Sequence, residues 1–455
     1  MKKNTSFPKA KRHPLNVSQF IALAFFCIIL LGTLLLTLPF SSRSGVSCGV
    51  FTALFTATSA TCVTGLVLAD TWTQWSGFGQ IVILSMIELG GLGFMSAASL
   101  VVFTLRKKMN MNQQLVIAQS IGAEGTGEAV KMQKKILIGC LSVEGIGAVL
   151  LALRFWPEYG FLTALKLGVF HSVSGFCNAG FDILGFRTPG GSMILYGSDF
   201  PVCIILTLLI SIGGVGFLVW DEIFRVRSPR KWSVYTKLVL LTSVALLLLG
   251  MVAFCLTEWN NPATLGPMSV PRKLTAALFQ SATTRTAGFA GIDQGGLTDA
   301  GKALTIFFML IGGSSGSTAG GLKTVTFIVL ILFLWARIRG RDTVSVFHRT
   351  IPNKYVLDAL TVFGVMIVLA FVGGTLICAT SQAGFTDGLY EAVSALATVG
   401  LTAGITPELS RIAQSLMILY MFFGRVGILT ISLGFLQSTQ SRHPFKYADT
   451  DLIIG

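Results

Sequence analysis

The sequence predicts an all-α integral membrane protein in which four tandem M1-P-M2 repeats (helix, pore loop, helix) surround a central pore with pseudo-fourfold symmetry. The chain of 455 residues is 53% hydrophobic and only 12% charged, which is too apolar to coat a soluble particle of this size with polar side chains. Long apolar stretches alternate with shorter ones, and four glycine-bearing segments recur at a regular interval. Eight spanning helices are therefore expected.

The long apolar stretches are interpreted as membrane-spanning helices. Residues 20–40 and 239–256 contain no charged side chain. A helix of this length, rising about 1.5 Å per residue, crosses or nearly crosses a hydrocarbon layer of roughly 30 Å. The basic run before the first stretch is typical of a signal peptide, but the stretch is too long and no small-residue cleavage site follows it. We expect it to be retained as the first span.

Basic residues gather at the chain ends and between the apolar stretches instead of covering one face. The net charge is +14, yet this distribution is typical of cytoplasmic loops and not of a protein that binds nucleic acid. Both termini are therefore expected on the cytoplasmic side. The basic groups are Lys2, Lys3, Lys9, Lys11 and Arg12; Arg106, Lys107, Lys108, Lys131, Lys134 and Lys135; Arg225, Arg227, Arg230 and Lys231; Arg337, Arg339, Arg341 and Arg349; and Arg442 with Lys446.

Four shorter apolar segments, each of roughly ten to fourteen residues, lie between the long ones, and a helix this short does not span. They begin near Phe51, Leu162, Leu274 and Leu389, and each is expected to enter the membrane and return. Each runs into a glycine-bearing sequence, and the central glycines recur about every 110 residues, which implies duplication of one unit. The four sequences are TCVTGL around Gly65, FCNAGF around Gly180, RTAGF around Gly288 and ATVGL around Gly400.

A glycine cluster in the last helix of each repeat forms a second landmark. The clusters are GGLGF (90–94), GGVGF (213–217), GGSSG (312–316) and GRVG (424–427), and residues 185–193 lengthen the second unit. The chain then divides into repeat 1 with a cytoplasmic N-terminus (1–105), a cytoplasmic linker with repeat 2 (106–232), repeat 3 with a gating loop (233–340), repeat 4 (341–439) and a cytoplasmic C-terminal tail (440–455).

The four loops have the chemistry of a cation filter. A dehydrated monovalent cation needs several oxygen ligands, and irregular backbone at membrane depth is tolerated where it lines a watery cavity. Glycine allows positive φ, so carbonyls can turn toward the axis, and the short helices would direct their negative C-terminal ends at it. Thr398-Val399-Gly400 matches part of the TVG sequence of potassium channels. The residues expected to bind K⁺ are Cys62, Val63, Thr64, Gly65, Cys177, Asn178, Ala179, Gly180, Thr286, Ala287, Gly288, Thr398, Val399 and Gly400.

Charged residues beside the loops have two interpretations. Asp70, Asp182 and Asp293 follow the loop glycines, where they either raise the local cation concentration at the outer mouth or serve as ordinary loop residues and helix caps. Arg285 directly precedes the third loop and would repel ions if it faced them. We expect it to lie behind the loop and to donate hydrogen bonds to backbone carbonyls.

Residues 311–323 read IGGSSGSTAGGLK, and this composition opposes a continuous helix. Unwound backbone within a span needs protein or water around it, so the segment is expected below the filter as a movable gate. Close helix packing through small residues is the alternative. The residues assigned to the gate are Gly312, Gly313, Ser314, Ser315, Gly316, Ser317, Thr318, Gly320, Gly321 and Arg425.

Arg425 lies within the apolar stretch 416–436, where a charge is costly unless it faces water or a partner. One hypothesis is that it projects into the pore below the filter as an electrostatic barrier to conduction. The other is a structural ion pair with Glu88 or Glu144.

Other function classes fit the sequence less well. An intramembrane enzyme needs a nucleophile with a base, or paired acids or histidines at helical spacing, and neither is found, so no enzymatic activity is expected. Eight scattered cysteines and four separated histidines give no disulfide framework and no metal site apart from the K⁺ filter, and no covalently bound cofactor is expected. Voltage-sensor helices are also absent from the pattern. An alternating-access secondary cation transporter remains the alternative, although such folds usually contain two inverted repeats.

The loops CVTGL, NAGF, RTAGF and ATVGL, the GGSSGSTAGG stretch, the GRVG segment and the terminal DLIIG together resemble the Trk/Ktr/HKT superfamily of potassium transporters. More specifically, they resemble the membrane subunit of bacterial Ktr-type potassium uptake systems. This resemblance implies filter glycines at Gly65, Gly180, Gly288 and Gly400 and a pore arginine at Arg425. Because a serine at the first filter glycine accompanies sodium transport in the plant relatives, Gly65 favours potassium.

The same resemblance implies properties that neither composition nor spacing indicates. They are a multi-pass location in the bacterial inner membrane and a homodimer with one pore per subunit. The resemblance also implies a cytosolic RCK-type regulatory subunit that binds nucleotide, and Na⁺ as an activator or coupling ion of K⁺ uptake.

Overall fold

The computed structural model describes residues 17–92 and 126–427. It confirms the prediction of an all-helical membrane fold, since the only strands in these ranges form one small hairpin. The basic N-terminal run, the start of the linker after residue 105 and the tail 440–455 lie outside the described residues.

Four long helices each open one repeat. They are α1 (Val17–Thr37), α7 (Thr126–Tyr159), α11 (Val234–Glu258) and α15 (Asn353–Thr380), and among the described residues they are the helices long and apolar enough to cross a membrane unaided. Many of their large apolar side chains are exposed, as on α11, which suits helices that face hydrocarbon.

A short helix follows each long one and packs against it. These helices are α2 (Val50–Thr61), α8 (Phe161–Phe176), α12 (Val270–Thr283) and α16 (Phe385–Leu396). All four begin within a few residues of the starts expected from the sequence. At about 1.5 Å per residue they reach only part of the way across a bilayer.

A second helix completes each repeat, and all four begin at a side-chain cap that accepts a backbone N–H. The helices are α4 (Gly77–Gly91), α9 (Phe200–Val215), α13 (Asp299–Leu310) and α17 (Arg411–Val426), and their caps are Ser76, Asp199, Thr298 and Ser410. Each of these helices packs against the short helix of the next repeat, and the last packs against the first: α4 on α8, α9 on α12, α13 on α16 and α17 on α2. The repeats therefore close into a ring.

These second helices refine the expectation of eight spanning helices. In the described ranges none of them crosses as one straight rod. The chain bends by 91° at Gly216 between α9 and α10 (Phe217–Arg225), and it leaves helical geometry over residues 311–323 before α14 (Thr324–Ile338). Glycine permits these breaks because it adopts backbone angles that other residues avoid.

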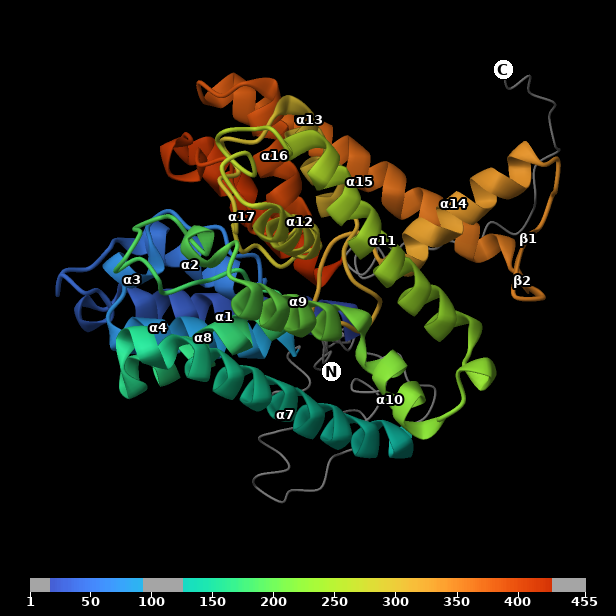
Figure 1. Ribbon diagram of the computed structural model, residues 1–455, viewed down its shortest axis with the longest axis horizontal. Coiled ribbons are helices and arrows are strands. Elements are labelled where there is room, and N and C mark those ends of the chain that lie inside the picture. The colour runs from blue at the N-terminus through green and yellow to red at the C-terminus, as the bar shows by residue number, and fades with distance from the viewer. Residues whose placement is uncertain (1–16, 93–125, 428–455) are drawn as a thin grey trace, which may run out of the picture.

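Short elements lie at the two ends of the long axis in Figure 1, with α3 (Thr71–Gln74) at one end and the hairpin of β1 (Val344–Val346) and β2 (Arg349–Ile351) at the other. The helix α10 also points toward the hairpin end. The remaining elements are single 3₁₀ turns: η1 (Pro39–Ser41), η2 (Ile194–Tyr196), η3 (Pro229–Lys231) and η4 (Thr406–Glu408).

Candidate ion-binding site

The four glycine-bearing loops have the same backbone conformation. In each, two residues with positive φ are separated by one residue, so left-handed and right-handed geometry alternate. Positive φ is uncommon outside glycine, and its recurrence at the same non-glycine position marks a constrained loop. Alternation of this kind turns neighbouring peptide groups toward the same side. The pairs are Val63 (φ 55°) with Gly65 (99°), Asn178 (59°) with Gly180 (68°), Thr286 (63°) with Gly288 (79°), and Thr398 (51°) with Gly400 (97°).

These loops meet in closed cyclic order. A methyl group added to any of the four loop glycines would come within 3 Å of a carbonyl oxygen in the next loop. The fourth loop closes on the first, so the turns converge on one axis. The pairs of glycine and carbonyl are Gly65 with Ala179, Gly180 with Ala287, Gly288 with Val399, and Gly400 with Thr64.

Hydroxyl groups near the end of each short helix hold the loops from behind. The Oγ atoms of Ser59 and Ser394 accept the amides of Gly65 and Gly400, at 3.0 and 3.1 Å. In the other two loops a hydroxyl donates instead to the carbonyl after the glycine: Ser174 to Phe181 at 2.7 Å and Thr283 to Phe289 at 2.8 Å.

The carbonyl oxygens of the loops keep their acceptor capacity. Within the described residues no hydrogen bond ends on the carbonyls of residues 62–64, 177–179, 286–287 or 398–399. Buried carbonyls are nearly always paired. The side chains of Thr64, Asn178, Thr286 and Thr398 are buried in the same loops and have polar atoms without a partner. The ring is therefore rich in oxygen atoms that a cation could coordinate.

The segment 311–323 leaves the helix and returns to the same point. Gly312 donates to the carbonyl of Leu322 at 2.9 Å, and Leu322 donates to the carbonyl of Leu310 at 3.0 Å. The absence of a helix here agrees with the sequence. Gly312 also lies so close to the Gly320 carbonyl that a Cβ would collide, so small residues pack backbone against backbone inside the loop itself.

This loop is bound mainly to repeat 2. Ser314 and Thr318 donate backbone amides to the carbonyls of Gly214 and Gly213, at 2.9 and 3.3 Å. The Thr318 hydroxyl donates to the Phe176 carbonyl at the end of α8, at 3.1 Å. On the other side, Gly320 approaches Thr398 of the fourth loop. The loop therefore lies directly against two of the four converging turns.

Arg425 joins this loop to repeat 1. Its guanidinium donates to the carbonyls of Thr318, Gly90 and Gly91. The alternative of an ion pair with Glu88 or Glu144 is wrong for the described residues, where Arg425 forms no ion pair, because backbone carbonyls at the end of α4 and in the loop occupy its donors.

Arg285 lies where it was expected. Its side chain is 8% exposed and donates to the carbonyl and hydroxyl of Ser243 at 3.2 and 3.3 Å, behind the third loop. The three aspartates act as local acceptors: Asp70 for Thr73, Asp182 for Leu184 and Asp293 for Gly295, at 2.8 to 3.0 Å. Burial raises the pKa of Asp182 to about 6.

Several site residues were missed from the sequence. Glu391 is fully buried and accepts from Thr402, Ala403 and Thr406, at 2.6, 3.0 and 2.7 Å, which fixes the chain after the fourth loop. Lys323 donates to the carbonyl of Ala319 at 2.8 Å and places a second basic side chain near Arg425. The sequence signal that could have identified both residues is a single acidic or basic side chain in or beside an apolar stretch.

Glu88, Glu144 and Cys177 bring possible metal-ligand atoms within 4.8 Å of one another, a grouping that spacing along the chain did not suggest. The Cys177 Sγ lies 3.6 Å from Glu88 and 3.8 Å from Glu144. Glu88 lies on α4, Glu144 on α7, and Cys177 caps the end of α8 at the start of the second loop.

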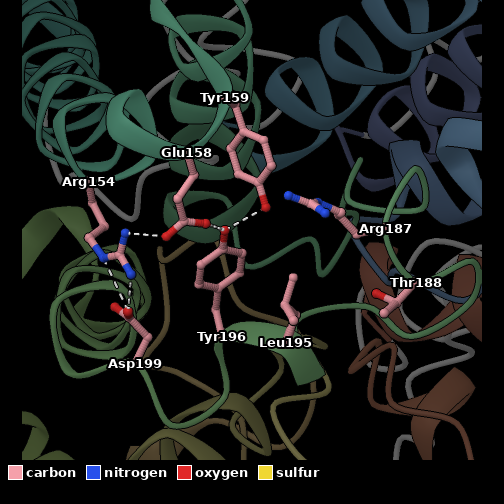
Figure 2. A pocket seen from close by; sticks show the side chains of 8 residues that line it. All are labelled: Arg154, Glu158, Tyr159, Arg187, Thr188, Leu195, Tyr196 and Asp199. Carbon is pink, nitrogen blue, oxygen red and sulfur yellow. Dashed lines mark hydrogen bonds and ion pairs between the residues drawn. The ribbon is translucent and has the colours of Figure 1, made fainter.

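A cavity of about 500 Å³ lies where α7 meets the chain before α9, and Figure 2 shows its lining. Arg154 donates to Asp199 at 3.1 Å and forms an ion pair with Glu158 at 2.6 Å. Tyr196 donates to Glu158, and its oxygen lies 2.7 Å from that of Tyr159. Arg187 also lines the cavity, so its two basic and two acidic groups balance in charge, and no residue expected in the filter or gate lines it.

Residues 4–447 match the TrkH family model, described as a cation transport protein. The chain belongs to this family. It is 38% identical to the potassium/sodium uptake protein NtpJ of Enterococcus hirae over 99% of this chain and all of the relative. It is 36% identical to the Ktr system potassium uptake protein B of Bacillus subtilis over 96% of each chain. The chain is thus a membrane ion transporter of the Trk/Ktr type and not an enzyme.

A solved structure has the same fold. The crystal structure of the potassium transporter TrkH from Vibrio parahaemolyticus matches with a TM-score of 0.68, covering 93% of this chain and 86% of that one. Because only 19% of the residues are identical, this likeness supports the fold and carries no argument about individual residues.

Proposed function

We propose that the chain conducts potassium ions across the bacterial inner membrane through the ring of four loops. The observation that carries this proposal is the closed cyclic order of the loops together with carbonyl oxygens that accept no hydrogen bond among the described residues. Such a ring replaces the water of a dehydrated monovalent cation. The names of the relatives, which specify potassium or potassium and sodium uptake, support K⁺ as the transported ion.

The four short helices add electrostatic support. Their C-terminal ends precede the loops directly, and the C-terminus of a helix carries partial negative charge. Gly65, with φ of 99° and a carbonyl of the second loop beside it, leaves no room for a side chain in this ring. In the proposal, the four glycine turns coordinate K⁺ and the buried threonines lie at the edge of the same site.

The loop 311–323 and Arg425 form the gate in this proposal. The loop lies against the second and fourth turns, and Arg425 bonds it to α4. A guanidinium beside the ring opposes cations electrostatically. Conduction then requires the loop to move away and the Arg425 hydrogen bonds to break.

Partners and orientation also belong to the proposal. The printed name of the Bacillus subtilis relative refers to a Ktr system, which supports a membrane subunit that works with other subunits. We assign a homodimer with one pore per chain and a cytosolic RCK-type subunit that binds nucleotide, with Na⁺ as activator or coupling ion. The basic residues 225–231 and the hairpin lie toward the same end of the molecule in Figure 1, which supports a cytoplasmic assignment for that end.

The decisive experiment is tracer uptake by the purified chain in liposomes. With an outward K⁺ gradient, ⁸⁶Rb⁺ should accumulate down its electrochemical gradient both with and without Na⁺, faster where Na⁺ acts as activator, and external K⁺ should compete with it better than external Na⁺ does. An alternating-access carrier would instead show uptake stimulated by substrate on the opposite side and a strict requirement for a coupling ion. Uptake no greater than in empty liposomes, with and without a cytosolic partner, would refute conduction.

A further inference from the structure

A second cavity, of about 420 Å³, lies between α11, α14, α15 and the β1–β2 hairpin. This volume is within the range of roughly 300–1,000 Å³ that is typical of small-molecule sites. Its floor is apolar, formed by the buried side chains of Leu238, Val329 and Ala359 from the three helices. Three residues of the β2 strand line it, and the hairpin marks the end of the molecule that we assign to the cytoplasm (Figure 1). With that proposed orientation, an apolar cavity among these helices lies at the level of the inner leaflet of the bilayer.

The mouth of this cavity carries two charges of opposite sign. Arg349 on β2 and Asp358 on α15 both line it and are exposed. Neither side chain has an ion-pair or hydrogen-bond partner among residues 17–92 and 126–427, although they share one cavity. In the cavity of Figure 2, by contrast, Arg154 forms ion pairs with Glu158 and Asp199. A ligand that carries both a phosphate and an ammonium group complements the unpaired charges.

The cavity is also in contact with the gating loop. Tyr235 lines the cavity, and its hydroxyl donates to the carbonyl of Ser315 in the loop at 3.1 Å. The opposite wall includes Val325 and Thr326, which lie in the first turn of α14, directly after the loop. An occupant therefore touches the loop's hydrogen-bond partner and the helix into which the loop runs.

We propose that this cavity binds an aminophospholipid, with a primary ammonium in its headgroup, from the cytoplasmic leaflet. The acyl chain lies on the apolar floor, the phosphate binds Arg349 and the ammonium binds Asp358. A purely anionic lipid satisfies only Arg349 and is repelled by Asp358. The bound lipid fixes Tyr235 and the first turn of α14 and so favours the loop position seen in this structure. Lipid binding rests on the cavity alone, whereas this effect on flux rests on the proposed gating role of the loop.

Binding is tested by native mass spectrometry of the detergent-purified chain with added phosphatidylethanolamine, phosphatidylglycerol or phosphatidylcholine. Phosphatidylethanolamine should bind best, and Arg349→Gln and Asp358→Asn should each weaken its binding about fivefold, which corresponds to about 1 kcal/mol, because each removes one charged contact at an exposed site. Arg341→Gln, at an exposed arginine outside the cavity, should leave binding within about twofold. Equal binding of phosphatidylglycerol, or no effect of either cavity variant, would overturn the assignment.

A steric variant tests the floor without changing charge. Ala359→Leu fills the cavity and should reduce lipid binding, whereas Leu357→Phe, at a side chain 63% exposed on the same helix, should not. In liposomes of phosphatidylcholine, adding phosphatidylethanolamine should lower ⁸⁶Rb⁺ uptake by the wild-type chain about threefold or more and leave Ala359→Leu unchanged. Lipid binding without any change in uptake overturns the link to the gate. Lipid binding with no uptake in either membrane overturns the proposed function and leaves the lipid site standing.

Discussion

Two glycines in the fourth repeat allow the convergence of the loops to be tested against backbone strain alone. Gly400 and Gly404 have nearly equal φ values of 97° and 94°. A Cβ on Gly400 would collide with the carbonyl of Thr64 and come within about 3 Å of Gly65, whereas a Cβ on Gly404 would meet no atom within 4 Å. Alanine at either position is therefore strained, but only alanine at 400 intrudes into the ring.

The expected sizes of the two effects differ. A left-handed conformation costs alanine about 1–2 kcal/mol, and both Gly400→Ala and Gly404→Ala should lose at least this much stability, with a further loss at position 400 from the clash with Thr64. At position 400 the Thr64 carbonyl must also shift by about 1 Å or more to reach ordinary van der Waals separation. We expect Gly400→Ala to lower K⁺ flux at least tenfold, equivalent to about 1.4 kcal/mol in the barrier, and Gly404→Ala to lower it less than twofold.

The assay is ⁸⁶Rb⁺ uptake into liposomes that contain equal amounts of each variant, with thermal unfolding followed in detergent as the measure of stability. A large difference in uptake between the two variants, both folded at the assay temperature, supports the ring. Equal uptake by the two variants, at equal incorporation, would show that the carbonyl of Thr64 does not matter for conduction, and the filter assignment would be wrong.

Further predictions concern the gate, the outer mouth and the loop support. Arg425→Ala should raise K⁺ uptake severalfold by freeing the loop and removing a positive charge, whereas Arg411→Ala at the start of the same helix should not. Unchanged or lower uptake by a folded Arg425→Ala protein contradicts the role of Arg425 in the gate. Burial raises the pKa of Asp182 to about 6, so this carboxyl is neutral below that pH and ionised above it. Uptake at low K⁺ should therefore rise between about pH 5 and 7. The same pH profile in the variant Asp182→Asn would exclude this cause. Ser394→Ala leaves the Gly400 amide without its acceptor, a cost of about 1–3 kcal/mol, and should reduce K⁺ over Na⁺ preference in competition assays, whereas Ser415→Ala, at an exposed hydroxyl, should not.

The repeat pattern could be predicted because it depends on local sequence. Four glycines at nearly equal intervals indicated four equivalent turns, and Gly65 and Gly400 occupy positions where the backbone excludes a side chain. The irregular segment 311–323 was likewise evident, since its glycines and serines disfavour a helix.

Long-range partners could not be predicted in the same way. Arg425 is bonded to carbonyls contributed by Thr318 and Gly90, and nothing in the local sequence says which distant backbone groups a charged side chain meets. The left-handed conformation of Val63 was also unexpected, because a β-branched residue disfavours it strongly and only the packing of all four loops stabilises it. The 91° bend at Gly216 has the same origin, since a glycine within an apolar run permits a bend without requiring it.

The contact between the loop and α10 joins the proposed gate to the end of repeat 2. Gly316 in the loop accepts the backbone N–H of Phe217, at 2.9 Å, and so satisfies the first amide of α10. The first amides of a helix have no partner inside it. When the loop withdraws, this amide loses its acceptor, and the nine-residue helix α10, which ends at Arg225, loses this hydrogen bond to the loop. If the loop gates conduction as proposed, opening also changes the start of α10, and a protein bound at the basic residues after α10 would act on ion flow through this helix.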